Sequence, residues 1–134
     1  MTGWTLRHPP GTGQEVARWT LDHPPQLQEL RADLREAVAA ELADVAERLM
    51  IVATELAGNA LRHGRPPAVV ALSRANGHLL LDVADHDPRS RPVVDASRSP
   101  GTGGLGLPLA ERLAHEVGWY PTGTGKHVWA TFTI

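Results

Sequence analysis

A stripe of apolar residues at helical spacing runs through the first half of the chain and constrains its fold more than any other feature. Its members recur every three or four residues: Leu27, Leu30, Leu34, Val38, Leu42, Val45, Leu49, Val52, Leu56 and Ala60. One helix of this length would exceed ~35 residues, which is long for a small domain. Asp44 and Glu47 resemble a capping box, so we predict two helices with a boundary near Asp44. The second helix ends at His63–Gly64, because Pro66–Pro67 cannot continue it.

Strand-like runs surround these two helices. The run from Val16 to Leu21 predicts a first strand, and the runs Ala68–Ser73 and Leu79–Ala84 predict two more. The turn signal Asn76-Gly77 joins the last two runs and favours an antiparallel hairpin. Residues 85–104 carry little apolar content, and a loop of this length in a small domain is usually functional or mobile.

The last third of the chain predicts one more helix and one more hairpin. Helical spacing relates four apolar residues: Leu105, Leu109, Leu113 and Val117. The run from Val117 to Tyr120, a turn at Pro121-Thr122-Gly123 and a final strand from His127 to Ile134 form the hairpin. The resulting order favours an α+β fold, a two-layer α/β sandwich with three helices on one face of a mostly antiparallel mixed sheet. We expect residues 1–13 to form a loose leader and residues 14–134 to form a single domain.

Composition and charge exclude several classes of function. The net charge of -2 and the pI near 6.4 leave no basic footprint, so we expect no nucleic-acid partner. The absence of cysteine removes disulfides, thiolate catalysis and cysteine-bound zinc, and the seven histidines lack metal-ligand spacing. No apolar run approaches the ~18 residues of a membrane span, and the N-terminus does not resemble a signal peptide. We therefore expect a cytoplasmic protein that makes no membrane contact.

An acid and an amide lie four residues apart in the second predicted helix, in the segment A-T-E-L-A-G-N-A-L-R-H. Glu55 and Asn59 therefore project from nearly the same side of that helix, one turn apart. An amide oxygen is a hard neutral ligand suited to Mg²⁺, and a carboxylate one turn away can orient or deprotonate a hydroxyl or water. The alternative is that Glu55 is a solvated helix residue and Asn59 a polar residue at the edge of the core.

A glycine run precedes the third predicted helix, from Gly101 to Leu107. Glycine lets backbone N–H groups approach phosphate oxygens closely, and the positive end of a helix beginning near Leu105 points the same way. The run is not a Walker A loop, because no Gly-Lys-Ser/Thr follows it. Asp85 follows the strand Leu79–Ala84, where a carboxylate can accept a hydrogen bond from an exocyclic amine such as that of adenine, or can be an ordinary turn aspartate.

Taken together, these segments resemble the GHKL ATP-binding superfamily, whose Bergerat fold is shared by DNA gyrase, histidine kinases and MutL. The segment T-E-L-A-G-N-A-L-R-H-G resembles its N box, Val83-Ala84-Asp85 its first glycine box, and Gly101 to Leu107 its second. Within the superfamily the chain is most similar to compact bacterial regulators of the anti-sigma-factor serine/threonine kinase type, and its Gly125 to Ala130 segment looks like actinobacterial members.

The resemblance implies a role for each matched residue. Glu55 matches the general-base or water-positioning acid, and Asn59 matches the Mg²⁺ ligand. Asp85 matches the aspartate that recognises adenine. The remaining matches would lie near the phosphates of ATP: Arg62, His63, Gly101, Gly103, Gly104, Leu105 and Gly106. Two departures stand out, because the first box reads Asp85-His86-Asp87-Pro88-Arg89 in place of Asp-x-Gly-x-Gly, and Lys126 occupies a position where threonine is common.

The function that the resemblance implies is an ATP- and Mg²⁺-dependent regulator. Its partners would be a sigma factor, which it sequesters, and an anti-sigma antagonist, on which it phosphorylates a serine. It would also form a homodimer. An alternative is a nucleotide-gated protein-binding module without phosphotransfer. A sensor histidine kinase is not favoured, since only ~40 residues precede the second predicted helix and leave no room for a phosphoacceptor hairpin.

Overall fold

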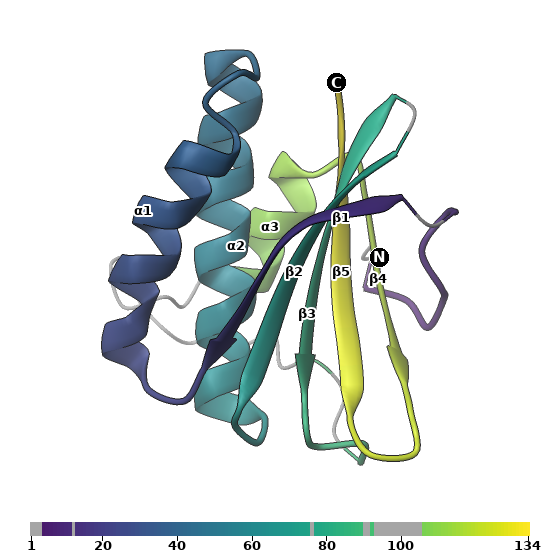
Figure 1. The fold of residues 1–134 in the computed structure, drawn as a ribbon. Helices are drawn as coiled ribbons and strands as arrows, with labels where there is room; N and C mark the ends of the chain where they lie inside the picture. The colour runs from purple at the N-terminus through teal and green to yellow at the C-terminus, as the bar shows by residue number, and fades with distance from the viewer. Residues whose placement is uncertain (1–3, 12, 76, 90–91, 93–105) are drawn as a thin grey trace.

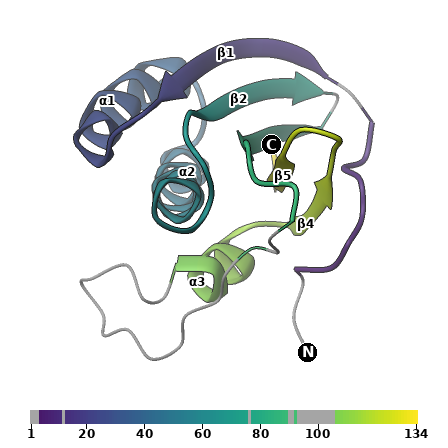
Figure 2. The same ribbon diagram turned by 90° about the horizontal axis from the view of Figure 1, so that it is seen from below.

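The computed structural model describes residues 4–11, 13–75, 77–89, 92 and 106–134. The described residues form one five-stranded sheet in the order β1-β2-β3-β5-β4, with every neighbouring pair antiparallel. The elements in chain order are β1 (Gln14–Leu21), a short 3-10 helix η1 (Pro24–Gln26), α1 (Leu27–Ala37), α2 (Ala43–His63), β2 (Ala68–Ala75), β3 (His78–Asp85), α3 (Gly106–Leu113), β4 (Glu116–Pro121) and β5 (Lys126–Thr133). The three helices lie together on one face of the sheet (Figures 1 and 2). The predicted two-layer α+β sandwich is confirmed.

The core lies between the helices and the helix-facing side of the sheet. Alternate residues of the central strands point inward and are at most 1% exposed: Val70, Leu72, Leu79, Leu81, Val83, Ala130 and Phe132. The apolar stripe of α2 meets them through Leu49, Val52, Ala53 and Leu56. The side chains of α2 that recur every three or four residues pack against the side chains that recur every second residue on the strands. This packing fixes both the position and the rotation of α2. The polar residues at the edge of its stripe are therefore held in fixed places.

The two predicted helices and their boundary near Asp44 are confirmed, but the predicted capping box is not. The helix α2 begins at Ala43, and its N-cap residue Leu42 makes no side-chain capping hydrogen bond. Asp44 lies inside the first turn, where its carboxylate accepts a hydrogen bond from Arg48 Nε at 3.0 Å. The predicted capping box was therefore wrong, since an acid within the first turn pairs with a base one turn further on and cannot also act as the cap.

The third helix is shorter than the helical spacing predicted. It ends at Leu113, and the chain enters β4 at Glu116. Val117, which continues the helical spacing, belongs to β4, where it pairs with Ala130 and packs into the core. Leu113 and Val117 both pack into the core, but Leu113 ends α3 and Val117 belongs to β4. Their spacing of four residues therefore does not indicate a continuous helix.

The segment Trp4–His8, within the expected leader, lies along β4 and adds a parallel bridge between Leu6 and Trp119. Trp119 donates its backbone N–H to Thr5 O at 3.1 Å and accepts one from Arg7 N at 2.9 Å. The indole of Trp4 is 6% exposed and donates to Leu107 O at 2.9 Å. The division into a leader and a domain stays a prediction, but residues 4–8 contact both the sheet and α3. No helix in the described ranges is both long enough and apolar enough to cross a membrane.

Candidate functional site

The first part of the candidate site lies where α2 faces the beginning of α3. Glu55 is half-buried on α2, and Asn59, one turn further on, is 8% exposed. Gly106, the first residue of α3, lies directly against Glu55, since a Cβ at residue 106 would be 2.9 Å from Glu55 Oε1. A carboxylate thus lies beside the N-terminal end of a helix, where the helix dipole favours negative charge.

The second part lies about two turns further along, at the C-terminal end of α2, where the helix meets the end of β3. Gly64 follows the last residue of α2 and donates its backbone N–H to Ala60 O at 2.9 Å. A Cβ at residue 64 would lie 2.2 Å from Asp85 Oδ2, so only glycine permits this approach. The sequence had identified Gly64 only as a helix terminator. Its contact with Asp85 was not predicted, because no local pattern links the end of a helix to the end of a strand.

Asp85 is the last residue of β3, and its side chain forms a buried ion pair with Lys126. The two residues are register partners on β3 and β5, and Lys126 Nζ lies 2.7 Å from Asp85 Oδ2. The side chain of Lys126 is 3% exposed and that of Asp85 is 2% exposed. The other carboxylate oxygen, Oδ1, accepts the backbone N–H of Asp87 at 2.7 Å. Lys126 had been noticed as a departure in the sequence, but the pairing follows only from the strand register.

The predicted site residues therefore divide into two groups, one in the middle of α2 and one at its C-terminal end. From Glu55 to Gly64 the helix advances by about 13 Å, at 1.5 Å per residue. Arg62 and His63 lie in the last turn of α2, and the guanidinium of Arg62 folds back beside Gly58. Such a line, with a carboxylate at one end and a charged pair at the other, suits an elongated polar ligand. Four predicted residues lie outside the described part of the chain: Gly101, Gly103, Gly104 and Leu105.

The described residues hold no cluster of three or more His, Asp or Glu side chains that would suit a protein-only metal site. Mg²⁺ needs no such cluster, because it keeps several waters and takes its other ligands from phosphate oxygens. The side-chain oxygen of the buried Asn59 is a ligand of the type that Mg²⁺ binds. The residues present are thus compatible with a metal brought in together with a nucleotide.

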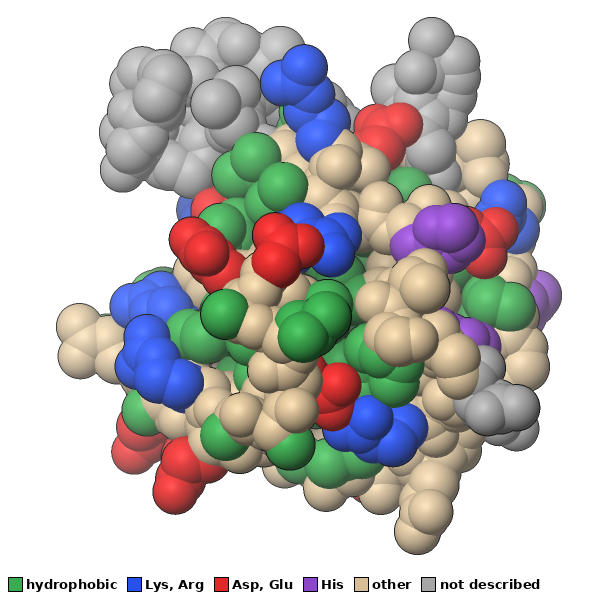
Figure 3. Space-filling view, turned by 90° about the horizontal axis from the view of Figure 1, so that it is seen from above, with side chains coloured by type: hydrophobic (Ala, Val, Ile, Leu, Met, Phe, Trp, Pro, Cys, Tyr) green, Lys and Arg blue, Asp and Glu red, His purple; other side chains and the backbone are tan. Residues whose placement is uncertain are grey.

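A groove of about 550 Å³ between α1 and α2 reaches the first part of the site. Its floor is largely apolar, with Met50 and Ile51 among the lining residues, and it ends at Thr54 and Glu55. Figure 3 shows hydrophobic side chains interspersed with acidic and basic ones at the upper end of the molecule. The groove offers a second approach to the Glu55 carboxylate, from the side of α1.

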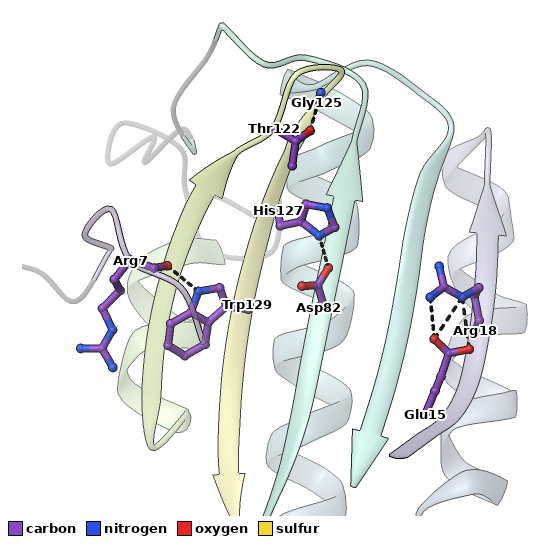
Figure 4. A network of polar contacts seen from close by, with 8 residues as sticks. All are labelled: Arg7, Glu15, Arg18, Asp82, Thr122, Gly125, His127 and Trp129. Carbon is purple, nitrogen blue, oxygen red and sulfur yellow. Dashed lines mark hydrogen bonds and ion pairs between the residues drawn. The ribbon is translucent and has the colours of Figure 1, made fainter. Parts of the chain in front are cut away.

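A separate polar cluster lies on the helix-free face of the sheet (Figure 4). His127 Nδ1 lies 2.6 Å from Asp82 Oδ1, and the ring of His127 stacks on Tyr120 with ring centroids 4.8 Å apart. The hydrogen bond with Asp82 raises the pKa of His127 above its usual value, while burial opposes the shift. These residues line a pocket of about 400 Å³ on the opposite side of the sheet from Glu55 and Asn59. No motif in the sequence had pointed to this cluster.

The fold defines a two-layer α+β sandwich domain, and comparison with known families gives the particular one. Residues 21–132 match the histidine kinase-like ATPase domain. The match spans most of the chain, so this protein belongs to the histidine kinase-like ATPase domain family and is supported as an ATP-binding protein. No curated protein matches the chain.

Two bacterial proteins are among the solved structures that share the fold. The RsbU and RsbW domains of Rv1364c from Mycobacterium tuberculosis superpose with a TM-score of 0.66 at 23% identity, over 87% of this chain and 32% of that one. The histidine kinase AdeS from Acinetobacter baumannii superposes with a TM-score of 0.52 at 14% identity, over 88% of this chain and 68% of that one. This chain thus spans about a third of the length of the mycobacterial protein.

Proposed function

We propose that this protein is an ATP-binding regulator of the anti-sigma type that acts as a serine/threonine protein kinase. The observation that carries the proposal is the placement of Glu55 and Asn59 on one side of α2, with Glu55 against the beginning of α3. Membership of the histidine kinase-like ATPase domain family supports ATP as the ligand. The similarity in fold to a structure that contains an RsbW domain supports a regulator of this type.

ATP would lie along α2, with its base at Asp85 and its phosphates toward α3. Glu55 accepts the proton of a substrate serine hydroxyl, whose oxygen attacks the γ-phosphorus, and ADP is the leaving group. Asn59 would hold Mg²⁺, whose charge would offset part of the phosphate charge. We assign the enclosing of the phosphates to Gly101, Gly103, Gly104, Leu105 and Gly106, whereas Arg62 and His63, in the last turn of α2, would lie toward the base end of ATP.

The partners in this proposal are proteins. A sigma factor is sequestered by the regulator, and an anti-sigma antagonist is the substrate that carries the serine. The groove that ends at Glu55 has room for a substrate segment. Arg31 and Arg35 line its α1 side, and Glu47 and Glu55 line its α2 side, so the groove suits a segment that carries both charges. We also propose that the protein acts in the cytoplasm as a homodimer, which light scattering on the purified chain would test.

Calorimetric titration of the purified chain with ATP tests the first step. Binding that strengthens when Mg²⁺ is added supports the assignment of Asn59, and absence of binding at millimolar ATP contradicts the proposal. Phosphotransfer is then tested with labelled ATP and purified candidate antagonists. The radioactive product should be phosphoserine on the antagonist and should not form with Glu55→Gln.

A second candidate function is a nucleotide-gated binding module without phosphotransfer. The departure in the first glycine box, which reads Asp85-His86-Asp87-Pro88-Arg89, favours it. The two candidates differ in one readout. A binding module would change its affinity for a partner when ATP is present, yet ATP would remain intact during prolonged incubation with that partner.

A further inference from the structure

The only lysine of this chain is buried at the base end of the candidate site. The sequence holds thirteen basic Lys and Arg residues, and Lys126 alone is a lysine. It is 3% exposed, next to Asp85. Taking both charges out of water is costly, and a well-packed apolar pair of similar volume is often as stable or more stable. Stability therefore gives no reason for a charged pair at this position.

The surroundings hold the two charged groups in a defined orientation. Asp85 Oδ1 is engaged by the backbone N–H of Asp87, so Oδ2 is left to face Lys126 Nζ. Gly64 contacts the carboxylate from α2, and a Cβ at Gly125 would lie 1.9 Å from the backbone oxygen of Asp85. These two glycines bring the end of α2 and the start of β5 onto Asp85. The result is a hydrogen-bond acceptor with a donor 2.7 Å away, both fixed by their neighbours.

This donor and acceptor complement one base better than the others. Adenine carries an exocyclic amine, which donates, with a ring nitrogen that accepts beside it on either edge. An ammonium group has three N–H donors, and Asp85 Oδ2 accepts from one of them. A carboxylate oxygen has capacity for more than one hydrogen bond. The amine of adenine thus matches Asp85, and the neighbouring ring nitrogen matches Lys126. Guanine and hypoxanthine replace the amine by an oxygen that would face the carboxylate.

We propose that Lys126 is a specificity-determining residue of the nucleotide site, which reads the base together with Asp85. Asp85 accepts a hydrogen bond from the exocyclic amine of adenine, and Lys126 donates one to the ring nitrogen beside that amine. The inference rests on the proposed binding of an adenine nucleotide along α2. It assigns to Lys126 a role in binding that is separate from phosphotransfer by Glu55.

Calorimetric titration with nucleoside diphosphates tests the proposal on the full chain. ADP, IDP, 1-deaza-ADP and 7-deaza-ADP are the probes, and the proteins are the wild type, Lys126→Met and the control Arg112→Met, which removes an exposed charge of α3. We expect ADP to bind the wild type at least about ten-fold more tightly than IDP does. One of the two deaza analogues, the one that lacks the ring nitrogen contacted by Lys126, should bind more weakly than ADP by a similar factor. Lys126→Met should weaken ADP binding and abolish the penalty of that deaza analogue. Arg112→Met should change neither quantity.

The outcomes separate this inference from the proposed function. If the wild type binds neither ADP nor IDP, the proposed nucleotide site itself is wrong. If both deaza analogues bind as tightly as ADP, Lys126 does not contact the base. The inference is then overturned, while the proposed function stands. Tighter binding of IDP than of ADP would also overturn it, since Lys126 would then donate to an exocyclic oxygen.

A second measurement does not depend on whether Lys126→Met folds. In wild-type protein labelled with ¹⁵N-lysine, a single ammonium signal is expected, because the chain has one lysine. Saturation with ADP should shift this signal, and saturation with the discriminating deaza analogue should shift it much less. An ammonium signal that ADP leaves unchanged would overturn the inference.

Discussion

Gly64 at the end of α2 and Asp85 at the end of β3 are in contact so close that no other residue fits at position 64. The carboxylate oxygen Oδ2 of Asp85 lies 2.2 Å from where a Cβ at residue 64 would be. This contact fixes the end of α2 relative to the sheet, and with it the distance from Asp85 to Glu55. The buried pair of Asp85 and Lys126 depends on the same contact, because the carboxylate cannot move without losing its partner.

Gly64→Ala should therefore destabilise the protein and impair nucleotide binding together. Forcing a methyl group against a buried carboxylate costs about 1–3 kcal/mol of unfolding free energy. Urea unfolding and calorimetry with ADP measure the two effects. Gly123→Ala is the matched control, since a Cβ there has no heavy atom within 4 Å. Equal stability of the two variants would contradict the close contact at residue 64.

Glu55→Gln should retain ATP binding and lose phosphotransfer. The substitution keeps the size of the side chain beside Gly106 but removes the proton acceptor, whose contribution to the rate is typically about 10²–10⁴-fold. Calorimetry and transfer of labelled phosphate to an antagonist give the two readouts. Glu36→Gln, at an exposed position of α1, serves as the control and should behave as the wild type. Loss of ATP binding in Glu55→Gln would show that Glu55 has a structural role.

Asn59→Ala should weaken ATP binding only when Mg²⁺ is present. The amide oxygen is the group assigned to the metal, so its removal matters only to the metal-bound nucleotide. Titrations in Mg²⁺ and in a chelator give the comparison, and a thermal unfolding curve checks that the buried site still folds. An equal loss of affinity under both conditions would contradict the role of Asn59 as a metal ligand.

The pair of Asp82 and His127 should make stability depend on pH. The hydrogen bond with Asp82 raises the folded-state pKa of His127 above its unfolded value of about 6.5. Its stabilising effect is therefore fully present below about pH 6.5 and is lost as the pH rises through the folded-state pKa. The difference in unfolding free energy between the wild type and Asp82→Asn should be larger at pH 6 than at pH 9.

The control for this prediction lies on the same face of the sheet. Glu15 pairs with Arg18, and both groups stay charged throughout this pH range (Figure 4). Glu15→Gln should therefore lower stability by the same small amount at both pH values. If the effect of Asp82→Asn were equally constant, His127 would not change its charge in the folded protein within this range.

The elements that the sequence predicted well are those in which the evidence is local. The apolar stripe on α2 and the alternation on β2 and β3 arise because every third or fourth residue, or every second one, must face the same core. The acid and amide of Glu55 and Asn59 were found for the same reason, since their spacing alone places them on one side of a helix. Local spacing misled at Val117, where two elements bury the same face of the sheet.

The sequence by itself determined the order of the elements, the face that each buries and the residues at one edge of α2. Only the tertiary structure decided that Trp4 contacts α3, that Gly64 contacts Asp85 and that Lys126 pairs with Asp85. Each of these contacts joins two elements, and strand register or helix docking sets its distance. The physical reason is that periodicity records which side of an element is buried, whereas the partner on that side depends on how the whole core packs.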